Sequence, residues 1–191
     1  MTVSRCKWLF TLGSLLVPLL VQAQQAHDIV AAQSELRFVS RQMGVPVDGR
    51  FTRFSGQVLL DPARPAANRV TLDVALDSVQ IGDDATAAEL RKPGWFDTAH
   101  YPSARFVSTQ VAPLGAGRYR VTGNFMLKGQ TQPLALDVAL AAQGGTTFAQ
   151  GSFTLKRLAY RIGEGEWNDV SLVADDVSVR FKLAIRGLAA P

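Results

Sequence analysis

An alternation of apolar and polar residues with a period of two runs through most of this chain and limits what it can fold into. In residues 70–77 the polar Thr71 and Asp73 alternate with aliphatic side chains, Val70, Leu72, Val74 and Leu76. Successive side chains of a strand point to opposite faces, so the pattern predicts half-buried β-strands. With 70–77 included, it predicts eight strands, at 34–43, 54–60, 70–77, 105–111, 118–128, 132–142, 147–160 and 177–185.

Short glycine-containing turns at 114–117, 128–130 and 144–145 separate several of these strands. One connection differs, because 85–90 is rich in alanine and follows Asp83 and Asp84, either of which can cap a short helix. Strands joined by hairpin-length turns are typical of a meandering antiparallel sheet. The sequence therefore predicts one all-β domain, an eight-stranded antiparallel barrel with a short helix.

The interior of an eight-stranded barrel is either filled with side chains or just wide enough for one small ligand, and periodicity does not choose between them. The same alternation occurs in membrane barrels with the apolar face outward. Here the polar parity carries charges of both signs, which favours a water-exposed exterior and an apolar interior: Asp73, Asp77, Arg118, Arg120, Asp137, Arg180 and Lys182.

The N-terminus predicts export. Arg5 and Lys7 precede an apolar run at 8–21, which ends in small and polar residues. This layout is typical of a signal peptide cleaved after Ala23, with Ala26 as the second choice, although a signal anchor is the alternative. The expected products are a signal peptide, 1–23, and a mature domain, 24–191. Cys6 leaves with the signal, so disulfides and thiol chemistry are not expected in the mature domain.

Candidates for catalysis are few. His27 is expected in a frayed N-terminus, whereas His100 has Asp97 three residues away and offers a hydrolase alternative. The carboxylates near the helix are explained by capping, and no histidine or cysteine cluster indicates a metal site. There is no Gly-x-Ser-x-Gly motif and no basic stripe for nucleic acid. We therefore expect a protein that is not an enzyme and has no metal or resident cofactor.

The aromatic segment 95–106 stands apart because it has neither a strand nor a helix period. It contains Trp95, Phe96, His100, Tyr101 and Phe106 within twelve residues. Aromatic side chains in such a connection pack over the end of a barrel or line its mouth. The segment is predicted to be a lid, and it suggests an apolar ligand site.

Four motifs in order resemble the YceI-like family, from about residue 33 to residue 186. They are Phe51-x-x-Phe54-Ser55-Gly56, the block from Glu89-Leu90-Arg91 through Trp95-Phe96-Asp97 to Tyr101-Pro102-x-Ala104-x-Phe106, Thr122-Gly123-Asn124-Phe125-x-Leu127-Lys128-Gly129-x-Thr131, and Ile162-Gly163-x-Gly165-Glu166-Trp167. The chain departs from the family at Gly82-Asp83-Asp84, where relatives often carry a longer polar helix.

The resemblance implies an exported bacterial protein, usually periplasmic, with a lipocalin-like extended barrel. It implies binding of a long apolar chain, such as a polyisoprenoid, an isoprenoid quinone or a fatty-acid derivative, as a ligand. Some relatives act beside cytochrome b561-type membrane proteins. An inner-membrane protein of that type is thus an expected partner. A homodimer is a separate expectation. In one alternative the barrel is a filled scaffold for the membrane protein.

The predicted lipid-binding residues come from two sources. The family's motif aromatics transfer to Trp95, Phe96, Tyr101, Phe106, Phe125 and Trp167. Strand parity and the helix add further apolar positions: Phe38, Phe54, Val58, Val74, Leu76, Leu90, Leu127, Leu136, Phe153, Leu155 and Phe181. The polar head group is expected near the mouth, beside Arg41, Arg91 or Lys92.

Overall fold

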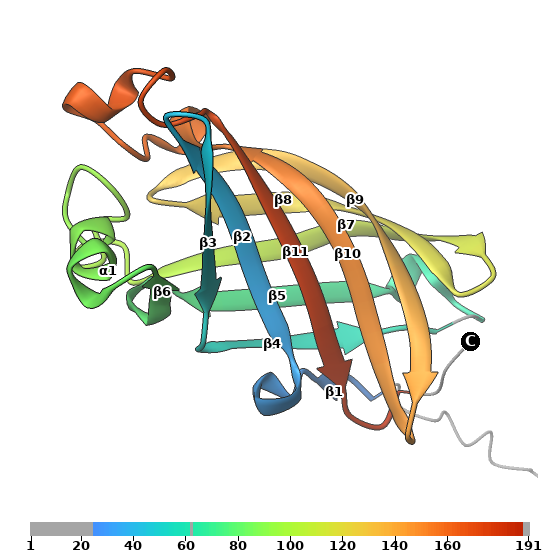
Figure 1. The fold of residues 1–191 in the computed structure, drawn as a ribbon. Helices are drawn as coiled ribbons and strands as arrows, with labels where there is room; N and C mark the ends of the chain where they lie inside the picture. The colour runs from blue at the N-terminus through green and yellow to red at the C-terminus, as the bar shows by residue number, and fades with distance from the viewer. Residues whose placement is uncertain (1–24, 62, 189–191) are drawn as a thin grey trace, which may run out of the picture.

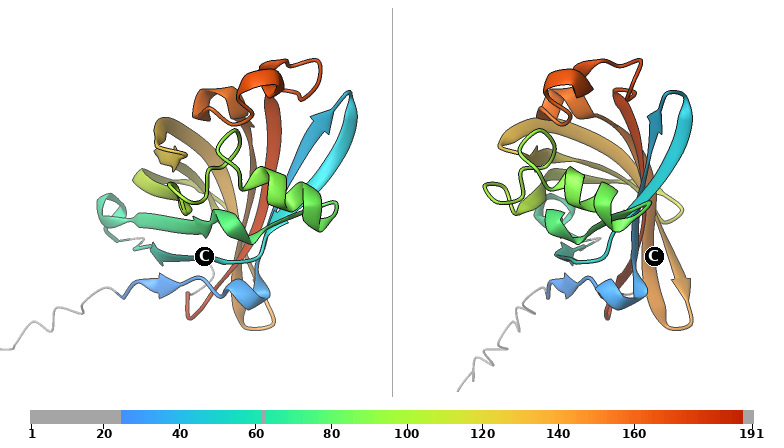
Figure 2. Two further views of the ribbon diagram at one scale, coloured as in Figure 1. Left: turned by 90° about the vertical axis from the view of Figure 1, so that its left-hand side faces the viewer. Right: turned by 60° about the vertical axis from the view of Figure 1, so that its left-hand side comes forward.

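The computed structural model describes residues 25–61 and 63–188. The predicted signal peptide, 1–23, lies outside the described residues. The described chain forms one antiparallel sheet of 11 strands in the order β1-β4-β5-β7-β8-β9-β10-β11-β2-β3-β6 (Figure 1). The sheet curls around a common axis, with helix α1 (Asp84–Leu90) and the segment 157–175 at the same end (Figure 2). The predicted all-β, lipocalin-like antiparallel architecture with one short helix is confirmed.

The strands have the following bounds: β1 (His27–Asp28), β2 (Glu35–Gln42), β3 (Val45–Phe51), β4 (Phe54–Leu59), β5 (Arg69–Ala75), β6 (Val79–Ile81), β7 (Ser103–Gly115), β8 (Arg118–Leu127), β9 (Gln130–Gln143), β10 (Thr146–Lys156) and β11 (Asp176–Ile185). Short 3-10 helices connect them: η1 (Ala31–Gln33), η2 (Pro65–Ala67), η3 (Leu76–Ser78), η4 (Arg157–Tyr160) and η5 (Gly165–Asn168).

The long hairpins have two-residue turns in which both residues have positive φ. In the β8–β9 turn Lys128 has φ 47° and Gly129 has φ 71°. Such turns match the right-handed twist of the flanking strands, and glycine adopts this backbone conformation without strain. The glycine-rich turns of the sequence therefore mark the hairpins correctly.

The strand count differs from the prediction of eight, because β1, β3 and β6 were not expected. Pro46, Asp48 and Gly49 interrupt the alternation in β3, and β6 is only 3 residues long. Pro46 lies opposite Arg41 of β2, whereas β6 pairs only with residues 49–51 of β3. Proline has no backbone N–H, but at this position no hydrogen bond to β6 is lost. The predicted strand 147–160 also ends earlier, at Lys156, and η4 begins at Arg157.

The N-terminal segment is paired rather than frayed, which corrects the expectation for His27. His27 lies opposite Val58 of β4, and its Nδ1 lies 3.0 Å from the carbonyl oxygen of Arg186. The Ile29 amide donates to Gly56 O of β4, whereas the Val30 amide donates to Ala184 O of β11. This segment therefore joins the two sides of the curled sheet at one end.

The inner face is packed closely at the points where rings cross glycines. Phe38 lies opposite Gly49, and Phe181 lies opposite Gly151. A Cβ added at Gly49 would approach the Phe38 ring to 2.2 Å, and one at Gly151 would approach the Phe181 ring to 2.6 Å. Because both rings lie directly over a neighbouring strand, they cover the sheet and leave the space along the axis open. No described helix is long and apolar enough to cross a membrane.

Candidate functional site

An apolar cavity of about 550 Å³ lies inside the curled sheet. Alternate residues of the strands line it, as the strand pattern predicts. On β9 they are Leu134, Leu136, Val138 and Leu140, and on β11 they are Val177, Val179, Phe181, Leu183 and Ile185. The volume lies within the range of about 300–1,000 Å³ that is typical of small-molecule sites.

The interior is hollow along β9 and more tightly packed at the C-terminal end of β11. The inward residues of β9 remain half-buried, although they face the inside of the sheet. Leu183 and Ile185 at the end of β11 are buried at 7% and 1% exposure. A side chain that faces the interior but is only half-buried has no neighbouring atoms on part of its surface, so it borders empty space. The sequence left open whether the interior is filled or hollow, and the structure shows a cavity.

Two closing segments, 83–102 and 157–175, lie at one end of the cavity (Figure 2). In the first, the Asp83 carboxylate accepts a hydrogen bond from the Thr86 amide at 2.8 Å and caps α1. The Trp95 ring lies 5.7 Å from the Trp167 ring of the second segment. Phe96 packs against Phe51 of β3 with a centroid distance of 5.9 Å. Aromatic contacts thus connect the lid to both the other closing segment and the sheet.

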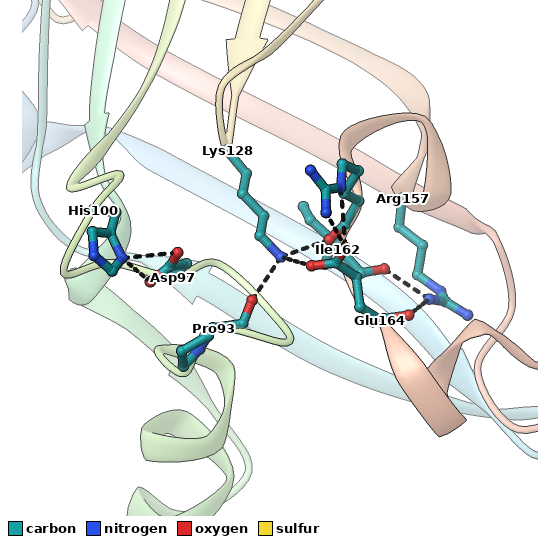
Figure 3. A network of polar contacts seen from close by, with 9 residues as sticks. Pro93, Asp97, His100, Lys128, Arg157, Ile162 and Glu164 are labelled. Carbon is teal, nitrogen blue, oxygen red and sulfur yellow. Dashed lines mark hydrogen bonds and ion pairs between the residues drawn. The ribbon is translucent and has the colours of Figure 1, made fainter.

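Lys128 at the β8–β9 turn binds the two closing segments to each other (Figure 3). Its Nζ donates to Pro93 O and Arg161 O, both at 2.7 Å, and to Glu164 Oε2 at 2.8 Å. All three ammonium donors are therefore used, which explains how this lysine is buried at 6% exposure. The hydrogen bond from Lys128, followed by that from Arg161, lowers the pKa of the Glu164 carboxyl.

Arg157 organises the second closing segment from within. Its side chain is 1% exposed. Its five N–H donors all bind main-chain carbonyls, at 2.6–3.3 Å, on Ile162, Gly163, Trp167, Val173 and Ala174. Burial is the main cause that lowers the pKa of the guanidinium, and Asp175 opposes this shift. The segment forms no strand over these residues, so the arginine supplies the hydrogen bonds that a neighbouring strand would give.

The predicted lipid-binding residues line the cavity, with two exceptions. Phe54 is buried in the core at the start of β4 and borders the gap beside Leu36 and Phe51 instead. Tyr101 is 38% exposed and lies against Gly129 of the β8–β9 turn. Neither residue lines the cavity. Lipid contact by the others remains a prediction.

Other cavity residues were not singled out in the sequence. Most are aliphatic and share the parity of a predicted strand, so the alternation itself would have found Leu36, Leu72, Leu134, Leu140 and Leu183. Phe51 belongs to the unexpected strand β3. Ser40 and Gln42 also line the cavity, and they share the parity of Leu36 and Phe38 although they are polar. No sequence pattern marks four further polar lining residues, Arg37, Thr86, Glu89 and Arg157.

The cations expected beside a head group do not line the cavity. Arg41 Nη1 donates to Gly44 O at 3.3 Å within the β2–β3 hairpin. Arg91 Nε donates to Asp77 O at 3.1 Å. Lys92 Nζ pairs with Glu89 Oε2 at 2.5 Å. The expected head-group position beside these three side chains is therefore not supported by the structure.

His100 and Asp97 form a pair outside the cavity (Figure 3). His100 Nδ1 lies 2.9 Å from Asp97 Oδ1, and the histidine side chain is 75% exposed. A catalytic pair for a buried apolar substrate has to reach that substrate, and this one faces solvent. Among the described residues no group of three or more side chains is arranged to hold a metal ion.

Comparisons with known proteins agree with this architecture. A family model described as the YceI-like domain matches residues 27–185. A UPF0312 protein of Shewanella sp. strain ANA-3 is 34% identical over 134 residues, which cover 69% of this chain and 70% of that protein.

Two solved structures share the fold. Burkholderia cenocepacia BcnA has a TM-score of 0.77 and 38% identity, with 82% of this chain and 98% of that chain covered. A polyisoprenoid binding domain from Saccharophagus degradans, implicated in plant cell wall breakdown, has a TM-score of 0.66 and 23% identity, with 88% and 100% covered. The match over nearly all described residues shows that this chain belongs to the family of YceI-like domains.

Proposed function

We propose that the protein binds a long apolar-chain lipid, such as a polyisoprenoid, an isoprenoid quinone or a fatty-acid derivative, in its cavity. The observation that carries the proposal is the cavity of about 550 Å³ with its almost wholly aliphatic and aromatic lining. The lipid is a carried ligand and not a cofactor. The shared fold of the Saccharophagus degradans polyisoprenoid binding domain supports the proposal.

Burial of the chain supplies the affinity. Each methylene group moved from water to an apolar site contributes about 0.8 kcal/mol, so an isoprenoid tail needs few polar contacts. The half-buried leucines and valine of β9 border the empty space and offer the contact surface. Contact between the ligand chain and these side chains adds dispersion attraction that the empty space lacks.

The proposal places the protein in the periplasm. Residues 1–23 have the layout of a cleaved signal peptide, with cleavage after Ala23. The partner proposed there is an inner-membrane protein of the cytochrome b561 type, either with one copy of the chain or with a dimer. The alternative in which the barrel of this protein is a filled scaffold for the membrane protein is disfavoured, because its interior contains a cavity.

The test is extraction of natively purified mature protein with organic solvent, followed by mass spectrometry. Leu136→Trp, which places an indole beside the empty space, serves as a blocked variant, and Ala139→Trp on the outward face of β9 is its matched control. We expect lipid in the wild-type and Ala139→Trp extracts and little in the Leu136→Trp extract. Absence of lipid from the wild type, together with no binding of a polyprenyl or quinone probe, would reject the proposal.

The hydrolase alternative has its own test. His100→Ala is expected to leave lipid content and probe binding unchanged, because His100 does not line the cavity. If the wild type hydrolysed a prenyl ester or fatty acyl ester and His100→Ala abolished that turnover, the protein would be an enzyme after all.

A further inference from the structure

Three arginines stand side by side on the outer face of the sheet. Strands β11, β2 and β3 are neighbours (Figure 1), and their register places Arg180 of β11 opposite Arg37 of β2, and Arg37 opposite Arg50 of β3. All three residues are exposed, whereas their chain neighbours Leu36 and Phe51 line the cavity. This arginine row thus puts three positive charges on adjacent strands, which are about 4.8 Å apart.

Elsewhere on the outer face the register brings opposite charges together. Arg105 of β7 lies opposite Asp73 of β5, Arg120 of β8 lies opposite Asp137 of β9, and each pair forms a salt bridge. Among the described strand pairs, like charges lie directly opposite each other only in the arginine row. Like charges in this position destabilise a sheet. The row therefore has a cost that a bound anion would offset.

The arginine row uses few of its donors within the protein. Arg37 Nε donates to Glu35 Oε2 at 2.9 Å, and Arg50 Nε donates to Gln80 Oε1 at 2.8 Å. Within the described part of the chain, the terminal Nη atoms of both side chains and the whole guanidinium group of Arg180 have no hydrogen-bond partner. Guanidinium groups bind the oxygens of phosphates and carboxylates through paired N–H donors. The row therefore offers several such donors to an anion from solution.

A cleft of about 240 Å³ adjoins the row, between the start of β2, the end of β3 and the start of β4. Arg37 and Arg50 line it, together with Glu35. Leu36, Arg37 and Phe51 line both this cleft and the cavity. An anion in the cleft would thus lie beside two guanidinium groups and next to the cavity wall.

The charges around the row leave a positive surplus. Two residues away along these strands, the charged side chains on the outer face are Lys182 of β11, Glu35 of β2 and Asp48 of β3. Together with the three arginines, they make four cations against two carboxylates. Lys182 Nζ lies 4.4 Å from the centre of the Phe148 ring of β10. A face with such a surplus attracts anions from solution.

We propose that the arginine row, with the adjoining cleft, binds a terminal phosphate group, carried either by a free phosphate compound or by a lipid head group. A terminal phosphate has three acceptor oxygens and about 1.5 to 2 negative charges at neutral pH, so it accepts from more than one guanidinium group. A carboxylate or a phosphodiester has a single charge and fits one guanidinium group. The site lies on the outer face and does not depend on the proposed lipid binding in the cavity.

The experiment measures two kinds of binding to the mature protein at low ionic strength and about pH 8, where a terminal phosphate is dianionic. Isothermal titration calorimetry measures inorganic phosphate. Co-sedimentation measures phosphatidylcholine vesicles that contain phosphatidic acid, with phosphatidylglycerol as the phosphodiester control. Binding of inorganic phosphate assigns the site to free phosphate compounds, and binding of phosphatidic acid vesicles alone assigns it to a lipid head group. Binding of neither would overturn the proposal, as would equal binding of both anionic vesicles without inorganic phosphate.

Two matched variants locate the site. Arg180→Gln removes one charge of the row, and Arg118→Gln removes the charge of an exposed arginine on β8 that lies opposite Ala139. We expect Arg180→Gln to weaken binding of the phosphate probe about fivefold, and Arg118→Gln to change it less than about twofold. Equal weakening in both variants would mean that net charge alone attracts the probe, and would overturn the proposal.

Glu35→Gln tests the same site in the opposite direction. It removes the carboxylate that pairs with Arg37 and leaves Arg37 Nε free for the anion. Binding of the phosphate probe should therefore tighten about two- to threefold. Weaker binding in this variant would contradict a role for Arg37 in the site.

Unfolding in urea tests the repulsion within the row. Without phosphate, Arg180→Gln should unfold at a higher urea concentration than the wild type, because it removes a like charge opposite Arg37, whereas Arg118→Gln should gain no stability. With phosphate the advantage of Arg180→Gln should shrink, since the anion stabilises the wild type more. If Arg180→Gln gained no stability without phosphate, the cost on which the proposal rests would be absent.

Discussion

The strands and the closing segments enclose the same cavity but are held in place by different interactions. The strands pair through continuous ladders, and their inner faces bury aliphatic side chains. The segments 83–102 and 157–175 are held by aromatic contacts, scattered main-chain hydrogen bonds and two buried cations, Lys128 and Arg157, whose donors mostly bind main-chain carbonyls. Carbonyls need donors wherever they are buried, so long basic side chains take the place of the ladder.

This difference predicts two kinds of response to substitution. In the strands, the loss of one side chain removes contacts in proportion to its buried volume. In the closing segments, the loss of one cation leaves several carbonyls without a donor at the same time. Changes of similar size should therefore cost more at the cations than along the strands.

Arg157→Met should have the largest effect. It leaves carbonyls from Ile162 to Ala174 without their donor, and we expect a loss of about 4 kcal/mol in the free energy of unfolding. The measurement is urea unfolding of the mature protein. Arg161→Met is the control, because that side chain is 65% exposed and its pair with Glu164 should contribute less than about 1 kcal/mol. Equal losses in both variants would show that Arg157 does not organise the segment.

Leu183→Ala and Leu136→Ala compare two sites within the strands. Leu183 is 7% exposed in β11, so its truncation should cost about 3 kcal/mol. Leu136 of β9 borders empty space, so its truncation removes fewer contacts and should cost about 1 kcal/mol. Urea unfolding of both variants without ligand gives the comparison. Equal costs would mean that the β9 side of the interior is packed in solution.

Sequence reasoning succeeded where the determinants are local. Alternation places the inner faces of the long strands, glycine marks the hairpin turns, and Asp83 caps α1. It missed β3, where Pro46 and Gly49 break the pattern, although Gly49 makes room for the Phe38 ring. Which residues of two paired strands lie opposite each other depends on the strand register, and the alternation within one strand does not give that register.

The polar contacts of the site could not be predicted from the sequence for a related reason. The sequence pattern predicts Lys128 in a hairpin turn and Arg157 in a strand. Their partners are main-chain carbonyls, and every residue has one, so no residue type signals the contact. Trp95 was placed correctly in the lid by its aromatic neighbours, but its unpaired N–H became visible only with its surroundings. The apolar site is thus more predictable than its polar details.

Lys128→Met should have an intermediate effect, because it removes three donors from the junction of the two closing segments. We expect a loss of about 2–3 kcal/mol in the free energy of unfolding. Hydrogen exchange locates the change, because the amides of Gly163 and Glu164 both bind Gly94 O across the junction. They should exchange faster, while β11 amides remain protected. Uniformly faster exchange would indicate global destabilisation without a local role for Lys128.

The smallest effect is expected from the pH dependence of Glu164. Hydrogen bonds from Lys128 and then Arg161 hold its pKa below the ordinary value of 4.5. A lowered folded pKa stabilises the protein above the unfolded value, and this contribution disappears as the pH falls through the folded pKa. The side chain is 34% exposed, so solvent screens the interaction to about 1 kcal/mol or less. Glu164→Gln removes the titrating carboxylate, so the variant should be less stable than the wild type at about pH 6. This difference in the free energy of unfolding, measured in urea, should shrink as the pH falls to about 3. If the stability deficit of Glu164→Gln stayed constant over this pH range, the Glu164 carboxylate would not contribute, and the two closing segments would be joined by the carbonyl contacts of Lys128 alone.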